Sequence, residues 1–218
     1  MVAAVFKQKC LKKAANRRVL ILISMKILIY LHGFRSSSQS HKALALGAAL
    51  RALSSDWEYI TPDLSFDPDI AFAQIDALML RCQKSDLTLV GSSLGGYYAQ
   101  VCAEAAGCRA VLLNPSLAPW DSLLEQVGPQ TAFYGDRESF TFTNEHLAAL
   151  HKRNVPVVTA PENFLVVVEM GDELLDHRAT LTKFADSPQI AVAGGNHDLA
   201  SFPSHIGAIL RHAGLSVT

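Results

Sequence analysis

The pentapeptide GSSLG at residues 91–95 brings together residue types that could perform chemistry. In the pattern G-x-S-x-G, the central serine lies at a sharp turn between a strand and a helix, with its hydroxyl exposed above a sheet. Glycines two positions before and after it let the neighbouring backbone segments pass close by. Only Ser93 has this spacing, because a valine stands two positions before Ser92. The sequence therefore predicts that Ser93 is a nucleophile and that Gly91 and Gly95 are required for its turn.

Two further polar residues follow predicted strands and could activate this serine. A nucleophilic serine needs a base to take its proton and an acid to orient that base. His197 ends the sequence GGNH after the last predicted strand, and Asp172 follows a glycine after the strongest predicted strand, at 164–168. The order Ser93, Asp172, His197 is typical of an α/β hydrolase. We expect these three residues to form a catalytic triad.

Two other acids, Glu173 and Asp176, compete with Asp172 for the orienting role. Asp172 is favoured because it directly follows the strand and its glycine, whereas Asp176 is expected about one turn inside the next helix.

The reaction would also need N–H donors aimed at the oxyanion of a tetrahedral intermediate. The first predicted strand runs directly into His32, Gly33 and Phe34. Gly33 allows this loop to fold back, which would point the N–H of Phe34 toward a substrate carbonyl. The N–H of Leu94, at the start of a helix, is the second expected donor. His32 is expected to pack and hydrogen-bond this loop rather than act as a base.

Short apolar runs alternate with helical patterns along the chain. Runs that are almost continuously apolar are typical of buried parallel strands, and such strands are expected at 26–31, 58–60, 87–90, 110–113, 164–168 and 189–192. Apolar residues three and four positions apart predict helices at 41–53, 69–82, 94–106, 120–127, 144–152, 174–185 and 202–212. This alternation predicts an α/β fold with a doubly wound, mainly parallel sheet.

The expected helix ends agree with this pattern. Asp69 is expected to cap the helix that follows it, the group at 143–145 to cap the helix from Asn144, and Gly107 to end the helix that begins near Leu94. Residues 114–143 are rich in proline and glycine, and we expect a loop-rich excursion over one end of the sheet.

Charge is distributed unevenly along the 218 residues. The net charge is −1, but residues 1–24 hold six lysines and arginines and no acid, so the remainder carries −7. We therefore expect two parts: a basic N-terminal extension at 1–24, outside the fold, and a single domain at 25–218. The domain lacks the basic stripe that nucleic-acid binding requires. The apolar run from Val19 to Leu31 is too short to span a bilayer, and Lys26 interrupts it, so a cytoplasmic protein is expected rather than an exported one.

The four cysteines form no C-x-x-C pair and have no histidine beside them at zinc-ligand spacing. Free thiols in a reducing compartment are therefore expected, with no metal site.

Several segments together resemble a known family. They are LIYLHGFRSSSQSHKA, LVGSSLGGYYA, the NPS at 114–116, GDELLDHR and GGNH. The chain from about Lys26 to Leu210 is similar to the YqiA/YcfP-like small bacterial esterases of the α/β-hydrolase superfamily. The resemblance implies an α/β-hydrolase fold with a minimal cap, esterase activity toward short-chain or thioester acyl groups, and no metal or organic cofactor. It also implies Ser93 as nucleophile, Asp172 as acid and His197 as base.

Three functions remain open at this point. The favoured one is a serine carboxylesterase that forms an acyl-enzyme from a small-molecule acyl ester. An acyl-CoA thioesterase differs only in its leaving group, although no basic groove for the phosphates is visible in the sequence. A non-catalytic binding protein on a hydrolase fold would be expected to have lost a triad residue. No membrane partner is expected for the domain, although the basic segment at 1–24 could bind an anionic membrane surface.

Overall fold

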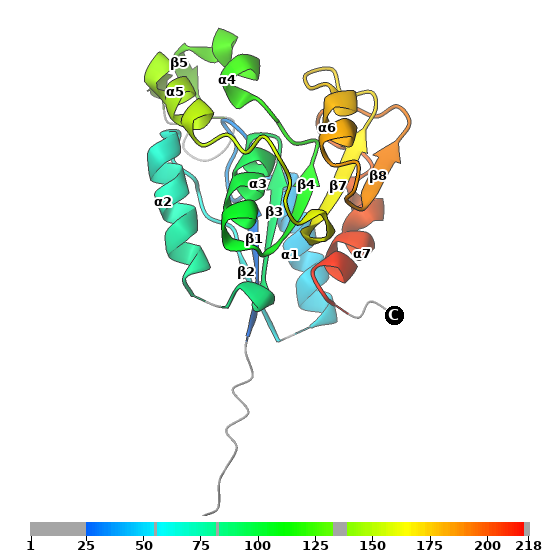
Figure 1. Cartoon of the computed structure of the whole chain (residues 1–218). Helices are drawn as coiled ribbons and strands as arrows, with labels where there is room; N and C mark the ends of the chain where they lie inside the picture. The colour runs from blue at the N-terminus through cyan, green and yellow to red at the C-terminus, as the bar shows by residue number, and fades with distance from the viewer. Residues whose placement is uncertain (1–24, 55, 82, 133–138, 216–218) are drawn as a thin grey trace, which may run out of the picture.

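The structure is a computed structural model that describes residues 25–54, 56–81, 83–132 and 139–215 (Figure 1). The predicted basic extension at 1–24 lies outside the described residues.

Six parallel strands form the main sheet, in the order β2-β1-β3-β4-β7-β8. Their bounds are β1 Lys26–Leu31, β2 Trp57–Ile60, β3 Leu87–Ser92, β4 Arg109–Leu113, β7 Phe164–Glu169 and β8 Gln189–Val192. Every residue of β3 and β7 is buried, which explains why these strands are apolar almost throughout. Because the strands are parallel, the loops that follow β1, β3, β4, β7 and β8 all begin at the same edge of the sheet.

Helices cover both faces of this sheet (Figure 1). Ile27, Ile29 and Leu31 of β1 join the core that includes residues of α2 and α3, whereas Leu28 and Tyr30 join the core that includes residues of α1 and α7. The helix bounds are α1 His41–Leu53, α2 Pro68–Met79, α3 Leu94–Ala106, α4 Pro119–Ser122, α5 Asn144–Lys152, α6 His177–Lys183 and α7 Phe202–His212, with short 3-10 helices at η1 Lys84–Asp86, η2 Leu124–Gln126 and η3 Pro161–Asn163. The predicted doubly wound parallel α/β fold is confirmed.

The excursion between β4 and α5 contains more regular structure than predicted. Its strands β5 Gly128–Thr131 and β6 Ser139–Phe142 pair antiparallel to form a separate two-stranded sheet. The helix predicted at 120–127 is wrong: one α-helical turn at α4 is followed by the 3-10 turn η2. The break falls at Leu123, whose φ of −103° and ψ of 6° lie outside the α-helical range.

The start of α2 differs from its prediction. The cap is Asp67 rather than Asp69, with Oδ1 of Asp67 accepting hydrogen bonds from the N–H groups of Asp69 and Ile70. Pro68 occupies the first helical position, where its fixed φ and missing N–H are tolerated.

The start of α6 also differs, because the helix begins at His177 rather than at 174. Asp176 is not inside this helix: it is the cap, and its carboxylate accepts the N–H of Arg178 at 2.9 Å. The predicted ends at Thr143 and Gly107 are confirmed, since Thr143 caps α5 in a capping box and Gly107 ends α3 in the left-handed conformation.

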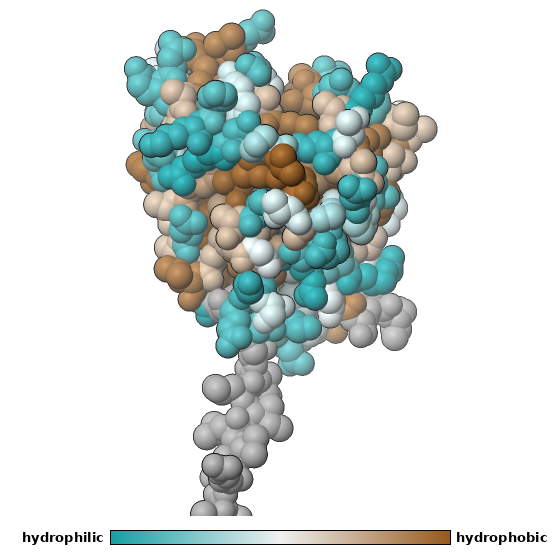
Figure 2. Space-filling view, in the orientation of Figure 1, coloured by the Kyte–Doolittle hydropathy of each residue, from teal (hydrophilic) through white to brown (hydrophobic). Residues whose placement is uncertain are grey.

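The surface in Figure 2 is mostly hydrophilic, with a hydrophobic patch near the middle of this face, in front of α3.

The segment between α5 and β7 is held against α3 because Nε2 of Gln100 donates to the carbonyl of Val155 at 3.1 Å. Within the described part of the chain, no helix combines the length and apolar character needed to cross a membrane.

Candidate active site

Ser93 lies between β3 and α3, and its backbone is strained. Its φ is 57° and its ψ is −119°, a combination that residues other than glycine rarely adopt. The turn also brings backbone segments into close contact. A Cβ at Gly91 would lie 2.0 Å from the carbonyl oxygen of Gly95, and a Cβ at Gly95 would lie 2.0 Å from that of Leu31. Both glycines are therefore required by space, as the sequence predicts.

The backbone of Ser93 is held by the turn that follows β4. Its N–H donates to the carbonyl of Leu113 at 3.0 Å, and its carbonyl accepts the N–H of Ser116 at 3.1 Å. The serine is thus fixed on both sides of its Cα by a neighbouring strand end.

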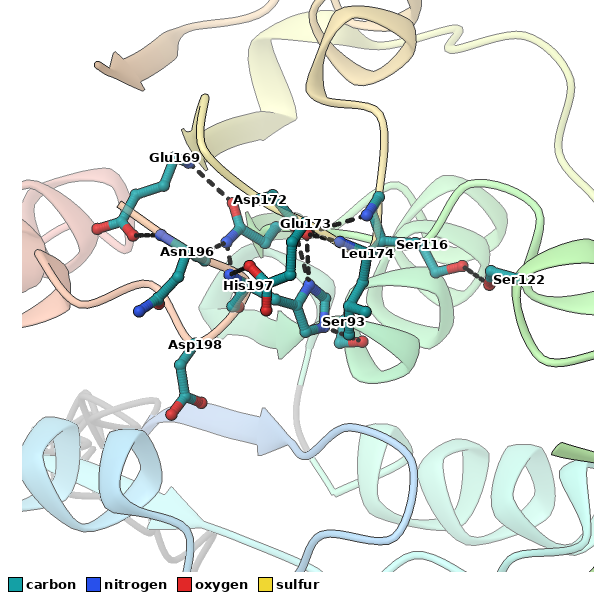
Figure 3. Close-up of polar contacts among 12 residues, drawn as sticks. Ser93, Ser116, Ser122, Glu169, Asp172, Glu173, Leu174, Asn196, His197 and Asp198 are labelled. Atoms are coloured by element: carbon teal, nitrogen blue, oxygen red, sulfur yellow. Dashed lines mark hydrogen bonds and ion pairs between the residues drawn. The ribbon is translucent and has the colours of Figure 1, made fainter. Parts of the chain in front are cut away.

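The structure brings the side chains of Ser93, Asp172 and His197 together in one hydrogen-bonded chain (Figure 3). Nε2 of His197 lies 3.0 Å from Oγ of Ser93, and Nδ1 of His197 lies 2.8 Å from Oδ2 of Asp172. A carboxylate can only accept, so Nδ1 carries the proton and donates. In the neutral imidazole, Nε2 is then the nitrogen that can accept from the serine hydroxyl.

Asp172 is held in its ionised form by several donors. Burial raises the pKa of this carboxyl, but the hydrogen bonds from His197 and from the N–H groups of Leu174 and Leu175 outweigh burial and lower it. Both of those N–H groups donate to Oδ1 of Asp172 at 2.9 Å. A carboxylate fixed in this way keeps its charge and its orientation toward His197.

The two competing acids have other partners. Glu173 is exposed, and its Oε2 accepts the main-chain N–H of His197 at 3.0 Å, so it contacts the loop but not the imidazole. Asp176 caps α6. Of the three neighbouring acids, Asp172 is the one bonded to the imidazole ring.

The loop after β1 lies against the serine. A Cβ at Gly33 would lie 3.3 Å from Cβ of Ser93. Within the described residues, no hydrogen-bond acceptor is present for the N–H of Phe34 or of Leu94. The ring of Phe34 makes edge-on contacts with Phe140 and Phe142, at centroid distances of 5.9 and 5.0 Å, which anchors the loop to the hairpin β5–β6.

His32 hydrogen-bonds this loop, as the sequence predicts, and it does so in its neutral form. Its Nδ1 donates to the carbonyl of Gly33 at 2.9 Å, and its Nε2 accepts the N–H of Leu64 at the same distance. Burial lowers the pKa of His32, although the hydrogen bond to Gly33 and the charge of Asp63 oppose it. The two hydrogen bonds need opposite roles for the two nitrogens, so only the neutral imidazole can make both.

Two residues of the site were missed by the sequence analysis. Glu169, the last residue of β7, is buried, and its carboxylate accepts three main-chain N–H groups of the segment 196–201. Asn114, directly after β4, donates to the carbonyls of Asn196 and His197. One signal was available for Glu169: an acid that closes an otherwise apolar buried strand needs hydrogen-bond partners.

A cavity of about 920 Å³ surrounds Ser93 and His197. Apolar side chains line much of it, among them Tyr30, Leu123, Leu174, Leu175, Phe202 and Pro203. A second cavity, of about 550 Å³, shares Phe34 and its neighbours with the first and is lined by Phe66, Tyr98 and Phe140. Polar and charged side chains, among them Arg35 and Lys42, line the rest of the first cavity, so the space around the serine suits a small molecule with both apolar and polar groups.

The all-parallel sheet with a serine turn directly after β3 defines the α/β-hydrolase class. Solved structures with this fold are similar to the chain. They include α/β hydrolase domain-containing protein 10 from mouse, with a TM-score of 0.64, 18% identity and coverage of 85% of this chain and 88% of that chain. Est1E from Butyrivibrio proteoclasticus has a TM-score of 0.64, 15% identity and coverage of 88% and 90%. At these identities the likeness shows the fold.

Within this class, the chain belongs to the Uncharacterised protein family UPF0227, whose model matches residues 27–214. The YqiA/YcfP-like resemblance is therefore confirmed. A UPF0227 protein of Shewanella woodyi is 27% identical over 106 residues, which are 46% of this chain and 57% of that relative. One of Yersinia enterocolitica is 24% identical over 166 residues, which are 71% of this chain and 79% of that relative.

Proposed function

We propose that this protein is a serine hydrolase that cleaves small acyl esters through an acyl-enzyme. The observation that carries the proposal is the continuous chain from Oγ of Ser93 to Nε2 of His197, at 3.0 Å, and from Nδ1 of His197 to Oδ2 of Asp172, at 2.8 Å. This is the arrangement of nucleophile, base and orienting acid that acyl transfer requires. Esterases and a thioesterase domain share the fold, which supports hydrolysis in general.

In the first half-reaction, His197 takes the proton of the Ser93 hydroxyl through Nε2 as Oγ attacks the ester carbonyl. The carbonyl π electrons move onto oxygen and give a tetrahedral oxyanion. The bond to the leaving oxygen then breaks, and the imidazolium returns its proton to the departing alcohol. Asp172 keeps the proton on Nδ1 of His197 and stabilises the imidazolium.

In the second half-reaction, His197 deprotonates a water molecule, which attacks the acyl group on Ser93. Collapse of the second tetrahedral intermediate breaks the acyl–Oγ bond, and the proton on Nε2 of His197 returns to Ser93. The acid product leaves and the enzyme is restored.

The oxyanion would be bound by the N–H groups of Phe34 and Leu94. Neither has an acceptor within the described residues, and the loop of Phe34 lies against Ser93. Leu94 is the first residue of α3, where the helix dipole adds to the attraction for an anion. A donor of this kind typically contributes about 3 kcal/mol of transition-state stabilisation.

An oxygen ester fits the catalytic cavity better than a coenzyme A thioester. A coenzyme A group carries several phosphate charges, which need cations. Lys42 and Arg35 line this cavity and both already have partners. Lys42 donates to the carbonyl of Asp198 at 2.7 Å and to its carboxylate at 3.2 Å, and Arg35 donates to the carbonyl of Thr131 at 2.7 Å. We therefore place the acyl-CoA thioesterase second.

The proposal is tested by labelling the full chain with a fluorophosphonate probe, wild type beside Ser93→Ala, and locating the adduct by peptide mass spectrometry. We expect one adduct on Ser93 in folded wild type, and none in Ser93→Ala or in heat-denatured wild type. Hydrolysis of p-nitrophenyl acyl esters from acetyl to octanoyl should fall by about 10⁴-fold or more in the variant, because it lacks the nucleophile.

Two results would decide against the proposal. Folded wild type that forms no adduct would favour a non-catalytic binding protein, and so would esterase activity retained in Ser93→Ala. Comparison of kcat/KM for matched acyl esters and acyl-CoA thioesters identifies the leaving group, and a preference for the thioester would reverse the order given above.

A further inference from the structure

Glu169 is a buried carboxylate that takes no part in the proton transfers proposed above. Its exposed fraction is 1%. Removing an ionised carboxylate from water is costly unless several donors replace the water. Here Oε2 accepts the N–H of Asn196 at 2.6 Å and that of Ala200 at 3.1 Å, and Oε1 accepts the N–H of Ser201 at 2.6 Å. Three main-chain donors thus converge on one side chain.

These donors come from both ends of the segment that carries His197. Asn196 directly precedes the histidine, whereas Ser201 is the cap position of α7. The carboxylate therefore joins the two ends of the loop through hydrogen bonds. It also lies at the N-terminus of α7, an eleven-residue helix, where the helix dipole favours a negative charge. Burial raises the pKa of Glu169, but the hydrogen bonds from Ser201, Asn196 and Ala200 outweigh burial and lower it. The group is ionised at neutral pH.

The contact between the loop and this carboxylate is close. Gly195 has a φ of +78°, and a Cβ added there would lie 2.0 Å from Oε2 of Glu169. Glycine is required here both by the backbone conformation and by the approach to the side chain.

Asn114 holds the same loop through its carbonyl groups. Its Nδ2 donates to the carbonyls of Asn196 at 3.0 Å and of His197 at 3.1 Å, and its Oδ1 accepts the N–H of Glu169 at 2.9 Å. The three partners fix the orientation of the amide, since each carbonyl needs a donor and the N–H needs an acceptor. Its φ of 38° lies in the left-handed region, which asparagine adopts more readily than most residues other than glycine.

The turn that carries Asn114 also holds the serine. The carbonyl of Leu113 accepts the N–H of Ser93, and the N–H of Ser116 donates to the carbonyl of Ser93. The turn after β4 therefore makes hydrogen bonds that hold both Ser93 and the loop of His197. Figure 3 shows Glu169 and Asn196 on one side of His197, with Asp172 and Ser93 against its ring.

We propose that Glu169 and Asn114 are positioning residues that hold the main chain of residues 196–201 so that Nε2 of His197 stays within hydrogen-bond distance of Ser93. This role rests on the proposed serine-hydrolase function. It differs from the role of Asp172, because neither residue touches the imidazole or the reacting atoms.

The test uses three variants of the full chain. Glu169→Met has nearly the same length and removes all acceptors, whereas Glu169→Gln retains one carbonyl oxygen. Asn114→Gly removes the amide and tolerates the positive φ. Glu58→Gln is the control for loss of a carboxylate. Glu58 lies on β2, at the edge of the sheet, and its carboxylate forms an ion pair with Arg81.

Three measurements are made on protein shown to be folded by circular dichroism. The rate constant for fluorophosphonate labelling should fall about 10- to 100-fold in Glu169→Met and Asn114→Gly, since displacement of a catalytic group by about 1 Å costs about that much. The loss in Glu169→Gln should be intermediate, and Glu58→Gln should match wild type. The kcat for an acyl ester should fall more than its KM rises, because the loop carries His197 but forms only one wall of the cavity.

The third measurement does not depend on activity. In wild type, the proton shared between Nδ1 of His197 and Asp172 should give a downfield NMR resonance, assigned by its loss in His197→Ala. We expect this resonance to be lost or broadened in Glu169→Met and retained in Glu58→Gln.

The outcomes separate the positioning role from the proposed function. Wild-type labelling rates together with an unchanged resonance in Glu169→Met and Asn114→Gly would overturn the positioning role. Lower stability with unchanged kcat would overturn it as well, because the two residues would then be structural only. If wild type neither labels nor hydrolyses esters, the proposed function fails, and the resonance alone decides whether the two residues hold His197. If Glu169→Met does not fold, Glu169→Gln and Asn114→Gly carry the test.

Discussion

The turn at Ser93 and the loop at His197 are held in different ways. The turn is fixed by close contacts of the main chain, because Gly91 and Gly95 leave no space for a Cβ. The loop is fixed by side chains that reach it from other strand ends, namely Glu169 and Asn114. The turn therefore depends on close packing of main-chain segments and on main-chain hydrogen bonds to Leu113 and Ser116, whereas the loop depends on hydrogen bonds from two distant side chains.

The largest effect is expected from Gly95→Ala, which places a methyl group inside the tightly packed turn. The added Cβ would lie 2.0 Å from the carbonyl oxygen of Leu31, so β1 or α3 must move. We expect the free energy of unfolding in urea to fall by about 3 kcal/mol or more and fluorophosphonate labelling to be lost. Gly207→Ala is the matched control. Its Cβ would meet only the flexible end of Arg211 at 3.4 Å, so it should stabilise α7 by about 0.5–1 kcal/mol. Equal unfolding midpoints for the two variants would contradict this account of the turn.

An intermediate effect is expected from Asp172→Asn, which removes the charge beside the imidazole of His197 and keeps the size of the side chain. The asparagine amide cannot hold the proton on Nδ1 of His197 as a carboxylate does, so kcat/KM for an acyl ester should fall about 10³- to 10⁴-fold with little change in stability. Glu173→Gln keeps an acceptor for the main-chain N–H of His197 and should cost less than about tenfold. If Glu173→Gln had the larger effect, Glu173 rather than Asp172 would be the orienting acid.

The smallest effect is expected from lowering the pH, which protonates the carboxylates that hold the histidine loop. Glu169 and Asp172 have pKa values below their usual range, so each contributes stability that is complete above the unfolded-state pKa of about 4. That contribution is lost as pH falls through the lower pKa of the folded state. Urea unfolding from pH 7 to pH 3 should show the difference in stability between wild type and Glu169→Gln shrink below about pH 4. A difference that stays constant over this range would mean that Glu169 does not carry the effect.

The same contrast explains what could be predicted from the sequence. The serine turn and the buried strands were predictable because glycine spacing and apolar runs are local patterns. Glu169 and Asn114 were missed because they meet only through the pairing of β4 with β7, which are separated by about 50 residues in sequence. The helix predicted at 120–127 was wrong because apolar spacing does not distinguish a single turn from a full helix when a proline and a glycine follow.

The hairpin β5–β6 pairs only with itself within the described residues, apart from the main sheet, yet it contributes Phe140 to the second cavity. Phe142 is nevertheless buried in the core, and both Phe140 and Phe142 contact Phe34, so the loop beside Ser93 depends on these two rings. The other positions of the hairpin are under weaker constraint from the fold, and under the proposed function substitutions there would change substrate preference while the chemistry stays the same. Directed evolution toward a new ester should begin at those positions.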